Sequence, residues 1–151
     1  MSHTFQTLTL IPHPINDVFR FFSKAANLQR ITPPELRFQI LTPQPVSMGK
    51  GVLIDYRLQL YGVPFKWSSL ITLWDPPFRF MDVQNKGPYK EWIHHHRFSE
   101  KREGTKMIDE VFYQLPLWPF GEIFYPLIHN QIRRIFRFRE KAIQEVFRAK
   151  T

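Results

Sequence analysis

The most constraining feature of the sequence is a series of short segments in which apolar and polar residues alternate, followed by one long amphipathic stretch. Six segments with strand character span residues 36–41, 51–60, 63–74, 78–84, 90–98 and 105–115. They are separated by short stretches rich in Pro, Gly, Asn and Asp, which are typical of turns. Strands so short and so closely spaced predict an antiparallel meander.

The two ends of the chain complete the predicted fold. Residues 5–11 alternate up to Pro12 and predict a first strand, and two short helices follow, the second capped by Ser23. Residues 122–148 show apolar positions at helical spacing and predict a long helix. A sheet with one apolar face needs a cover, and this helix is the only predicted element large enough. We therefore expect an α+β fold in a single domain over residues 1–151, with a curved antiparallel sheet of about seven strands wrapped round the C-terminal helix.

Composition narrows the functional classes. None of the 151 residues is cysteine. This excludes a disulfide scaffold, a thiolate metal site and a cysteine nucleophile, and suits a reducing compartment. No apolar run reaches the roughly 18–20 residues that span a bilayer, and the first residues lack the pattern of a signal peptide. We expect a cytoplasmic protein.

The positive charge is concentrated near the C-terminus. The net charge is +8, and residues 133–150 contain seven basic side chains against two acidic ones. An arginine-rich helix could bind phosphates, which leaves nucleic-acid binding as an alternative. The same arginines also suit the solvated face of an amphipathic helix, and no aromatic–basic RNA motif is present. We expect no nucleic-acid partner.

Strand alternation assigns side chains to an inner face of the sheet. A two-residue turn at Tyr61-Gly62 places Leu60 opposite Val63 and Tyr56 opposite Trp67. Continued along the chain, the alternation predicts an inner face that also contains Ile54, Leu58, Phe65, Ile71, Leu73, Phe78, Phe80, Asp82, Gln84, Trp92, His94, His96, Phe98, Thr105, Met107, Asp109, Val111, Tyr113 and Leu115.

Polar residues interrupt this otherwise apolar face. They are Asp82, Gln84, His94, His96 and Asp109. A symmetric turn over residues 99–104 predicts that His94 lies opposite Asp109 and Trp92 opposite Val111. Buried polar groups must bond to each other, to water or to a ligand. The pattern leaves two interpretations: a small-molecule cavity, or a solid core with a satisfied His–Asp pair.

Several local patterns occur along nearly the whole chain. They are Val18-Phe19-x-Phe21-Phe22, Asn27-Leu28-x-x-Ile31-Thr32-Pro33-Pro34, Ile54-x-Tyr56-x-Leu58, Gly87-Pro88-Tyr89-x-x-Trp92-x-His94-x-His96-x-Phe98, Gly104-Thr105-x-Met107-x-Asp109 and Leu115-Pro116. With the order of elements, they resemble the helix-grip or START-like fold, and more narrowly the SRPBCC ligand-binding proteins of the polyketide cyclase/dehydrase-like group. The resemblance implies an elongated cavity between sheet and C-terminal helix for lipids, polyketides, isoprenoid quinones or hormones. It specifies the activity poorly, because members differ in ligand and chemistry.

From the residues and the resemblance together we expect a carrier or sensor that binds a hydrophobic small molecule without a cofactor. The predicted ligand-binding residues are Tyr56, Trp67, Asp82, Gln84, Trp92, His94, His96, Met107, Asp109, Val111, Tyr113, Ile128, Ile132 and Ile135.

Catalysis remains an alternative. His94 and Asp109 are a candidate acid–base pair, because two such groups in an apolar pocket perturb each other's pKa. The corresponding activity is that of a cofactor-independent cyclase, dehydratase or isomerase. His94 and His96 share a strand face and could ligate zinc, but no second motif has ligand spacing, so we expect no metal. No Gly-x-Ser-x-Gly motif marks a serine nucleophile.

The stretch over residues 115–128 is strongly apolar and immediately precedes the basic helix. Transient contact with an anionic membrane is predicted for Leu117, Trp118, Phe120, Phe124 and Tyr125. The cationic side chains beside them are Arg133, Arg134, Arg137 and Arg139. The same segment is predicted to gate the cavity. The alternative is that it packs the start of the helix onto the sheet.

Overall fold

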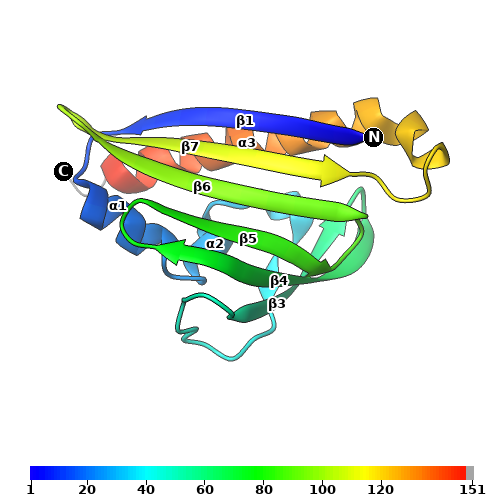
Figure 1. The fold of residues 1–151 in the computed structure, drawn as a ribbon, viewed down its shortest axis with the longest axis horizontal. Helices are drawn as coiled ribbons and strands as arrows, with labels where there is room; N and C mark the ends of the chain where they lie inside the picture. Colours follow the sequence, from blue (N-terminus) through cyan, green and yellow to red (C-terminus); the bar gives the residue numbers. More distant parts are fainter. Residues whose placement is uncertain (149–151) are drawn as a thin grey trace.

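The computed structural model describes residues 1–148, so Lys150, one of the basic residues counted above, lies outside the described residues. A curved sheet forms one layer, and the helices lie on its concave side (Figure 1). In chain order the elements are β1 (Ser2–Ile11), α1 (Ile15–Phe22), α2 (Asn27–Arg30), the 3₁₀ helix η1 (Pro34–Leu36), β2 (Gln39–Ile40), β3 (Leu53–Leu60), β4 (Val63–Asp75), β5 (Arg79–Lys86), β6 (Glu91–Lys101), β7 (Gly104–Gln114), the 3₁₀ helix η2 (Phe120–Phe124) and α3 (Tyr125–Arg148).

The seven strands form one antiparallel sheet in the order β1-β7-β6-β5-β4-β3-β2. Pairing of β1 with β7, from Ser2–Gln114 to Ile11–Thr105, brings the start of the chain beside the last strand. Helix α3 runs along the sheet behind β1 and β7 (Figure 1). The predicted α+β architecture, with its seven-stranded sheet, two short helices and long C-terminal helix, is confirmed.

Some boundaries differ from the prediction. The strand expected over residues 36–41 is reduced to Gln39–Ile40, because η1 takes its first residue. Ser23 ends α1 instead of capping a second helix, and its hydroxyl donates to the Phe19 carbonyl at 2.8 Å. The long helix begins at Tyr125, after η2. Pro126 lies in its first turn, where the missing N–H costs no hydrogen bond.

The β3–β4 hairpin follows the predicted register. Tyr61 and Gly62 have φ angles of 51° and 77°, as a type I′ turn requires. Leu60 pairs with Val63 and Tyr56 with Trp67, as expected.

The β6–β7 hairpin corrects the predicted register by two residues. Lys101 pairs with Gly104, so the turn contains only residues 102–103 and is tighter than the symmetric loop assumed from sequence. Asp109 therefore lies opposite His96 instead of His94, and Trp92 lies opposite Tyr113. The tight turn requires a glycine at its end: Gly104 has φ 145°, and a Cβ there would collide with the Ile11 carbonyl oxygen.

Two residues predicted on the inner face, Leu73 and Phe78, do not lie there, and for Leu73 the reason is irregular pairing in β4. The register with β5 shifts between Ile71 and Leu73, which reverses the alternation beyond that point. Trp74, not Leu73, then lies on the inner face, with its ring centroid 5.4 Å from that of Phe80. Phe78 lies in the β4–β5 turn and is exposed.

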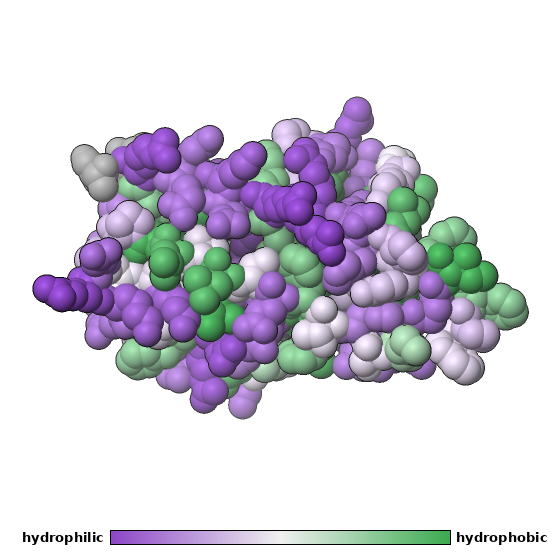
Figure 2. All heavy atoms as spheres, turned by 90° about the horizontal axis from the view of Figure 1, so that it is seen from above, coloured by the Kyte–Doolittle hydropathy of each residue, from purple (hydrophilic) through white to green (hydrophobic). Residues whose placement is uncertain are grey.

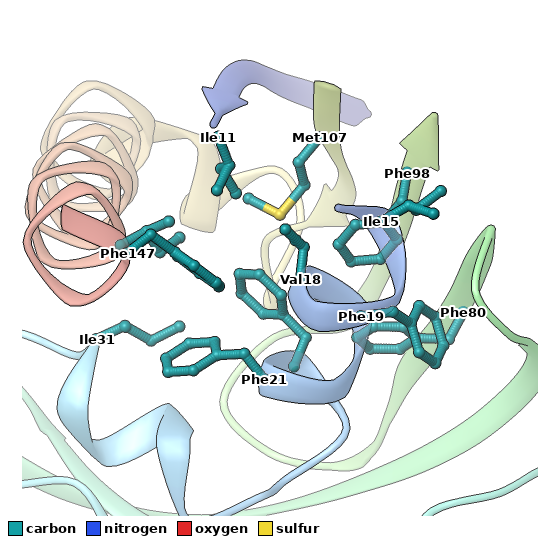
Figure 3. Close-up of a cluster of buried hydrophobic side chains, with 12 residues drawn as sticks. Ile11, Ile15, Val18, Phe19, Phe21, Ile31, Phe80, Phe98, Met107 and Phe147 are labelled. Carbon is teal, nitrogen blue, oxygen red and sulfur yellow. The ribbon is translucent and has the colours of Figure 1, made fainter. Parts of the chain in front are cut away.

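The largest core cluster fills the end of the molecule where α1 meets the end of α3. Val18 of α1, Met107 of β7 and Phe147 of α3 are almost completely buried there (Figure 3). Phe19 makes edge-on ring contacts with Phe98 at 5.3 Å and with other aromatic rings of this cluster. Many of the phenylalanines thus close one end of the two-layer structure, away from the tyrosines and tryptophans described next.

Candidate functional site

A cavity of about 170 Å³ lies between the concave face of β3–β6, the segment from α1 to β3, and α3. It is lined by Phe22, Ala25, Leu28, Thr32, Leu36, Phe38, Met48, Ile54, Tyr56, Leu58, Leu60, Trp67, Ser69, Ile71, Phe80, Asp82, Tyr89, Trp92, His94, His96, Ile132, Ile135, Phe136 and Arg139. Small-molecule pockets usually measure about 300–1,000 Å³, whereas a cavity of about 150 Å³ holds benzene. The enclosed space therefore suits a compact ring system.

The cavity brings together part of the predicted site. Eight predicted residues line it: Tyr56, Trp67, Asp82, Trp92, His94, His96, Ile132 and Ile135. Six predicted residues do not: Gln84, Met107, Asp109, Val111, Tyr113 and Ile128.

The six other residues are held by packing or hydrogen bonds. Met107 belongs to the core cluster around α1, while Val111, Tyr113 and Ile128 pack together near the start of α3. The Gln84 amide donates to the Tyr89 carbonyl at 2.7 Å and accepts from the Tyr89 N–H at 3.1 Å. The inner side chains of β7 pack in the same core clusters as side chains of α3. They therefore fill the core instead of facing the cavity.

Sequence reasoning missed two parts of the lining. Ala25 and Met48 from loops and Leu36 from η1 line the cavity, and no periodic pattern in the sequence marks such residues. The burial of Arg139 could have been predicted from the sequence. It lies three residues after Phe136 and four before Ile143, on the apolar stripe of α3.

One end of the cavity is an aromatic wall. The Tyr56 and Trp67 rings are stacked at 6.0 Å, and Trp67 meets Trp92 edge-on at 5.4 Å. Tyr89 contacts both tryptophans. Such a wall offers broad, flat contact to an apolar ring.

Two crossed His–Asp pairs adjoin this wall, since Ser69 lies 3.5 Å from the Tyr56 hydroxyl and 3.4 Å from Asp82 Oδ1. His94 and His96 are both on the inner face of β6, because alternate residues of a strand share a face, and their rings stack at 3.6 Å. His94 Nε2 donates to Asp109 Oδ1 at 2.8 Å, and His96 Nε2 donates to Asp82 Oδ2 at 2.7 Å. Each histidine thus bonds the carboxylate diagonal to it, since Asp82 lies opposite His94 and Asp109 opposite His96.

Asp109 lies behind the histidines and is the centre of the network. Its Oδ1 is 3.2 Å from His96 Nδ1 and 3.6 Å from Arg139 Nη2. The carboxylate is 2% exposed, so its charge is stabilised by these neighbours and not by solvent. Asp109 therefore positions His94, His96 and Arg139, which in turn face the cavity.

The two histidines of the network have pKa values shifted in opposite directions. Burial and the neighbouring His96 lower the pKa of His94 to about 4, against the opposing effect of Asp109 and Asp82. Burial would also lower the pKa of His96, but hydrogen bonds to Asp109 and Asp82 outweigh it, and the net pKa is raised. His94 is the neutral member of the pair.

The carboxyl groups are held ionised. Burial alone would raise the pKa of Asp109, but Arg139 and the hydrogen bond from His94 hold it well below its usual range. Burial would likewise raise the pKa of Asp82, but the His96 hydrogen bond together with the nearby charges of His96, His94 and Arg139 lowers it. Asp109 is thus a poor proton donor and does not line the cavity, which argues against the predicted His94–Asp109 acid–base pair.

The lowered pKa of His94 predicts a loss of stability on acidification. Between about pH 6.5 and the folded value of about 4, the unfolded chain binds a proton at His94 that the folded chain does not. Stability therefore falls as the pH falls through this window. Urea midpoints measured across it are expected to show a shallower acid slope for His94→Gln, and an unchanged slope contradicts the assignment.

Other groups do not reverse this slope. The raised pKa of His96 affects stability only above the unfolded histidine value, where stability is lost as the pH rises through the folded pKa. The lowered carboxyl pKa values act below about pH 4. His95 and His129 also have lowered pKa values, mainly through burial, so His94→Gln reduces the slope without abolishing it.

Within residues 1–148, one cluster of potential metal ligands has suitable proximity. Asp82, His94 and His96 each offer a ligand atom, all within 4.8 Å of one another. Asp82 and His96 already bond each other, and the Arg139 guanidinium is close to the network. The cluster is chemically able to hold a divalent ion, and the expectation that none is bound stays a prediction.

Comparison with known proteins identifies similar chains. Residues 11–136 match the family "Polyketide cyclase / dehydrase and lipid transport". The Zhui aromatase/cyclase from Streptomyces sp. R1128 superposes with a TM-score of 0.79 at 12% identity, covering 98% of this chain and 94% of that chain. A START superfamily protein from Mycobacterium smegmatis gives a TM-score of 0.68 at 9% identity, with 96% and 98% covered.

A third solved structure matches over the full length. A protein from Thermus thermophilus gives a TM-score of 0.68 at 18% identity, with 100% of this chain and 99% of that chain covered. No curated protein matches the sequence. At these identities the solved structures establish the fold alone, and the expected helix-grip, START-like arrangement is confirmed.

Proposed function

Because the chain belongs to the polyketide cyclase/dehydrase and lipid transport family, we propose that its cavity binds a hydrophobic small molecule such as a lipid, an isoprenoid quinone or a polyketide. The observation that carries the proposal is a cavity with apolar and aromatic walls and a few polar side chains, chiefly Asp82, His94, His96 and Arg139. This is the usual arrangement in which polar groups orient an apolar ligand. The protein acts as a carrier or sensor in the cytoplasm.

In this proposal the cavity encloses a ring of the ligand, and any longer apolar tail of the ligand extends out of the cavity through one side. Leu28, Phe38 and Met48 line the cavity and are only half-buried, so they are our candidate for the side through which such a chain leaves. Their flexible or aromatic side chains can cover an apolar tail at low cost.

Native mass spectrometry of freshly purified, untagged protein tests the proposal. We expect a bound organic mass, or binding of at least one member of a panel of lipids, quinones and polyketides. A bare protein that ignores the entire panel contradicts ligand binding.

A second candidate function is cyclase, dehydratase or isomerase chemistry on such a ligand. Its supporting observation is that the two buried histidines with oppositely shifted pKa values both line the cavity. His96→Gln separates the two functions. An enzyme loses turnover by about 10²–10⁴-fold with binding retained, whereas a carrier shows no turnover to lose.

The segment before α3 supports transient docking to an anionic membrane. Leu117, Trp118, Phe120 and Phe124 are all more than half exposed. Figure 2 shows the hydrophobic side chains gathered at this end of the molecule. Two exposed residues, Ile123 and Leu127, extend the set beyond the prediction. No helix within residues 1–148 is sufficiently long and apolar to cross a bilayer, so any contact made by this segment is interfacial.

Three details of the membrane prediction need correction. Tyr125 is half-buried and stacks on His3 at 4.1 Å, so it anchors the segment. Arg139 is buried, and Arg134 pairs with Glu35 at 3.0 Å, which leaves the exposed Arg133 and Arg137 as the basic residues of the proposal. No residue of 117–125 lines the cavity, so the segment is not placed to gate it.

Vesicle co-sedimentation tests the docking. We expect salt-sensitive binding to phosphatidylserine vesicles and none to phosphatidylcholine, since each basic residue near an anionic surface contributes about 1 kcal/mol. Trp118→Ala/Phe120→Ala should abolish binding. Phe78→Ala is the matched control, because Phe78 is 53% exposed but lies in the β4–β5 turn. Equal loss in both variants, or no binding at low salt, contradicts the docking.

A further inference from the structure

Arg139 is a buried cation with unused hydrogen-bond donors beside the cavity. Its residue surface is 8% exposed, and it lines the cavity from α3. Among the described residues, no acceptor reaches its Nε or Nη2 within hydrogen-bond geometry. The nearest carboxylate oxygen, Asp109 Oδ1, is 3.6 Å from Nη2, which makes a weak ion pair but no hydrogen bond.

Aromatic packing holds the guanidinium in place. Its carbon lies 5.4 Å from the centre of the Phe22 ring and 5.6 Å from that of Phe136. These contacts stabilise the charge but use the ring faces and leave the N–H groups without acceptors. Because guanidinium donates and cannot accept, a buried guanidinium with open N–H groups calls for an acceptor from outside the chain.

Two carboxylates already accompany the guanidinium. Asp109 Oδ1 is 3.6 Å from Arg139 Nη2, and Asp82 joins the same network through its hydrogen bond with His96. A neutral ligand adds no charge to this group. An anionic ligand adds a further buried negative charge, which is costly without a counter-ion.

We propose that the cavity selects a compact, uncharged, mostly apolar molecule whose carbonyl oxygen accepts hydrogen bonds from Arg139. The inference deepens the proposed function and rests on it. A carbonyl fits better than a hydroxyl because it accepts without bringing a donor that would itself need a partner. The volume of about 170 Å³ limits the enclosed part to a small ring system that carries the carbonyl, as in a cyclic ketone or a quinone.

Calorimetric titration with three probes of one skeleton tests the proposal. The probes are α-tetralone, the hydrocarbon tetralin and tetralin carboxylate, all at neutral pH. We expect α-tetralone to bind at least about ten-fold more tightly than tetralin, the usual value of a hydrogen bond to a charged donor. We expect the carboxylate to bind more weakly than the ketone, because it adds a buried negative charge.

Variants assign the preference to Arg139. Arg139→Met alone would leave Asp109 short of a counter-charge, so it is combined with Asp109→Asn, which keeps the buried charges balanced. The double variant should lose the ketone preference, so that α-tetralone binds no more tightly to it than tetralin does. Arg139→Lys keeps the charge without the planar fork and should lose most of the preference.

The outcomes separate this inference from the proposed function. If the wild type binds tetralin and α-tetralone equally, the cavity binds apolar molecules but the carbonyl selection is overturned. A preference that persists in the double variant, or a carboxylate that binds more tightly than the ketone, also overturns it. If the wild type binds none of the probes, both the selection and the proposed ring-binding cavity fail.

Discussion

Replacing Asp109 with Asn is expected to lower the free energy of unfolding by about 3–5 kcal/mol, because it leaves buried positive charges without their partner. Asp109 is 2% exposed and contacts His94, His96 and Arg139 at 2.8, 3.2 and 3.6 Å. The asparagine keeps the shape of the side chain but not its charge. Urea unfolding should show a lower midpoint with an unchanged slope.

A matched control and a rescue make this prediction specific. Asp55→Asn changes an exposed carboxylate on β3 and should shift stability by less than about 0.5 kcal/mol. Adding Arg139→Met to Asp109→Asn removes the unpaired cation and should recover part of the loss. If the free energy of unfolding of Asp109→Asn lies within about 1 kcal/mol of the wild-type value, Asp109 is not the buried counter-charge described above.

Filling the cavity is expected to abolish ligand binding. Ala25 is buried, lines the cavity and carries only a methyl group, so Ala25→Trp directs an indole into a space of about 170 Å³. We expect α-tetralone affinity to fall by at least about 100-fold, which corresponds to about 2.7 kcal/mol. Calorimetric titration measures the loss.

Ala26→Trp is the matched control for the filled cavity. Ala26 is the next residue, is exposed and does not line the cavity, so the same substitution there should leave affinity within about two-fold of wild type. Circular dichroism and a thermal midpoint establish that both variants fold. A folded Ala25→Trp protein that still binds the ketone normally would place the ligand elsewhere.

The sequence predicted the architecture well because its strongest signals are local. Alternation, turn residues and helical spacing each depend on near neighbours, and they were sufficient to predict seven strands and the long helix. They also predicted that His94, His96 and Asp82 would share the cavity face. The type I′ turn at Tyr61-Gly62 set the β3–β4 register correctly, since that turn has a recognisable composition.

The sequence predictions were wrong where the pairing register of a strand, or the length of a turn, decides which side chains face each other. The tight β6–β7 turn shifted Asp109 from His94 to His96, although the diagonal hydrogen bond still joins Asp109 to His94. The irregularity in β4 exchanged Leu73 for Trp74 on the inner face, and no sequence pattern marks it. Alternation identifies a face but not which part of that face is covered by core packing, so it could not show that Met107 and Val111 belong to core clusters and do not line the cavity.

The indole N–H signals of the four tryptophans offer the most direct test of the central claim, that a ligand occupies the cavity between sheet and helix. Trp67 and Trp92 line the cavity, whereas Trp74 packs beside Phe19 and Trp118 is exposed on the segment before α3. On titration with α-tetralone, heteronuclear NMR should show the Trp67 and Trp92 signals shifting together with saturation, while those of Trp74 and Trp118 stay nearly fixed. Saturable shifts confined to Trp118, or no shift at Trp67 and Trp92, would contradict it.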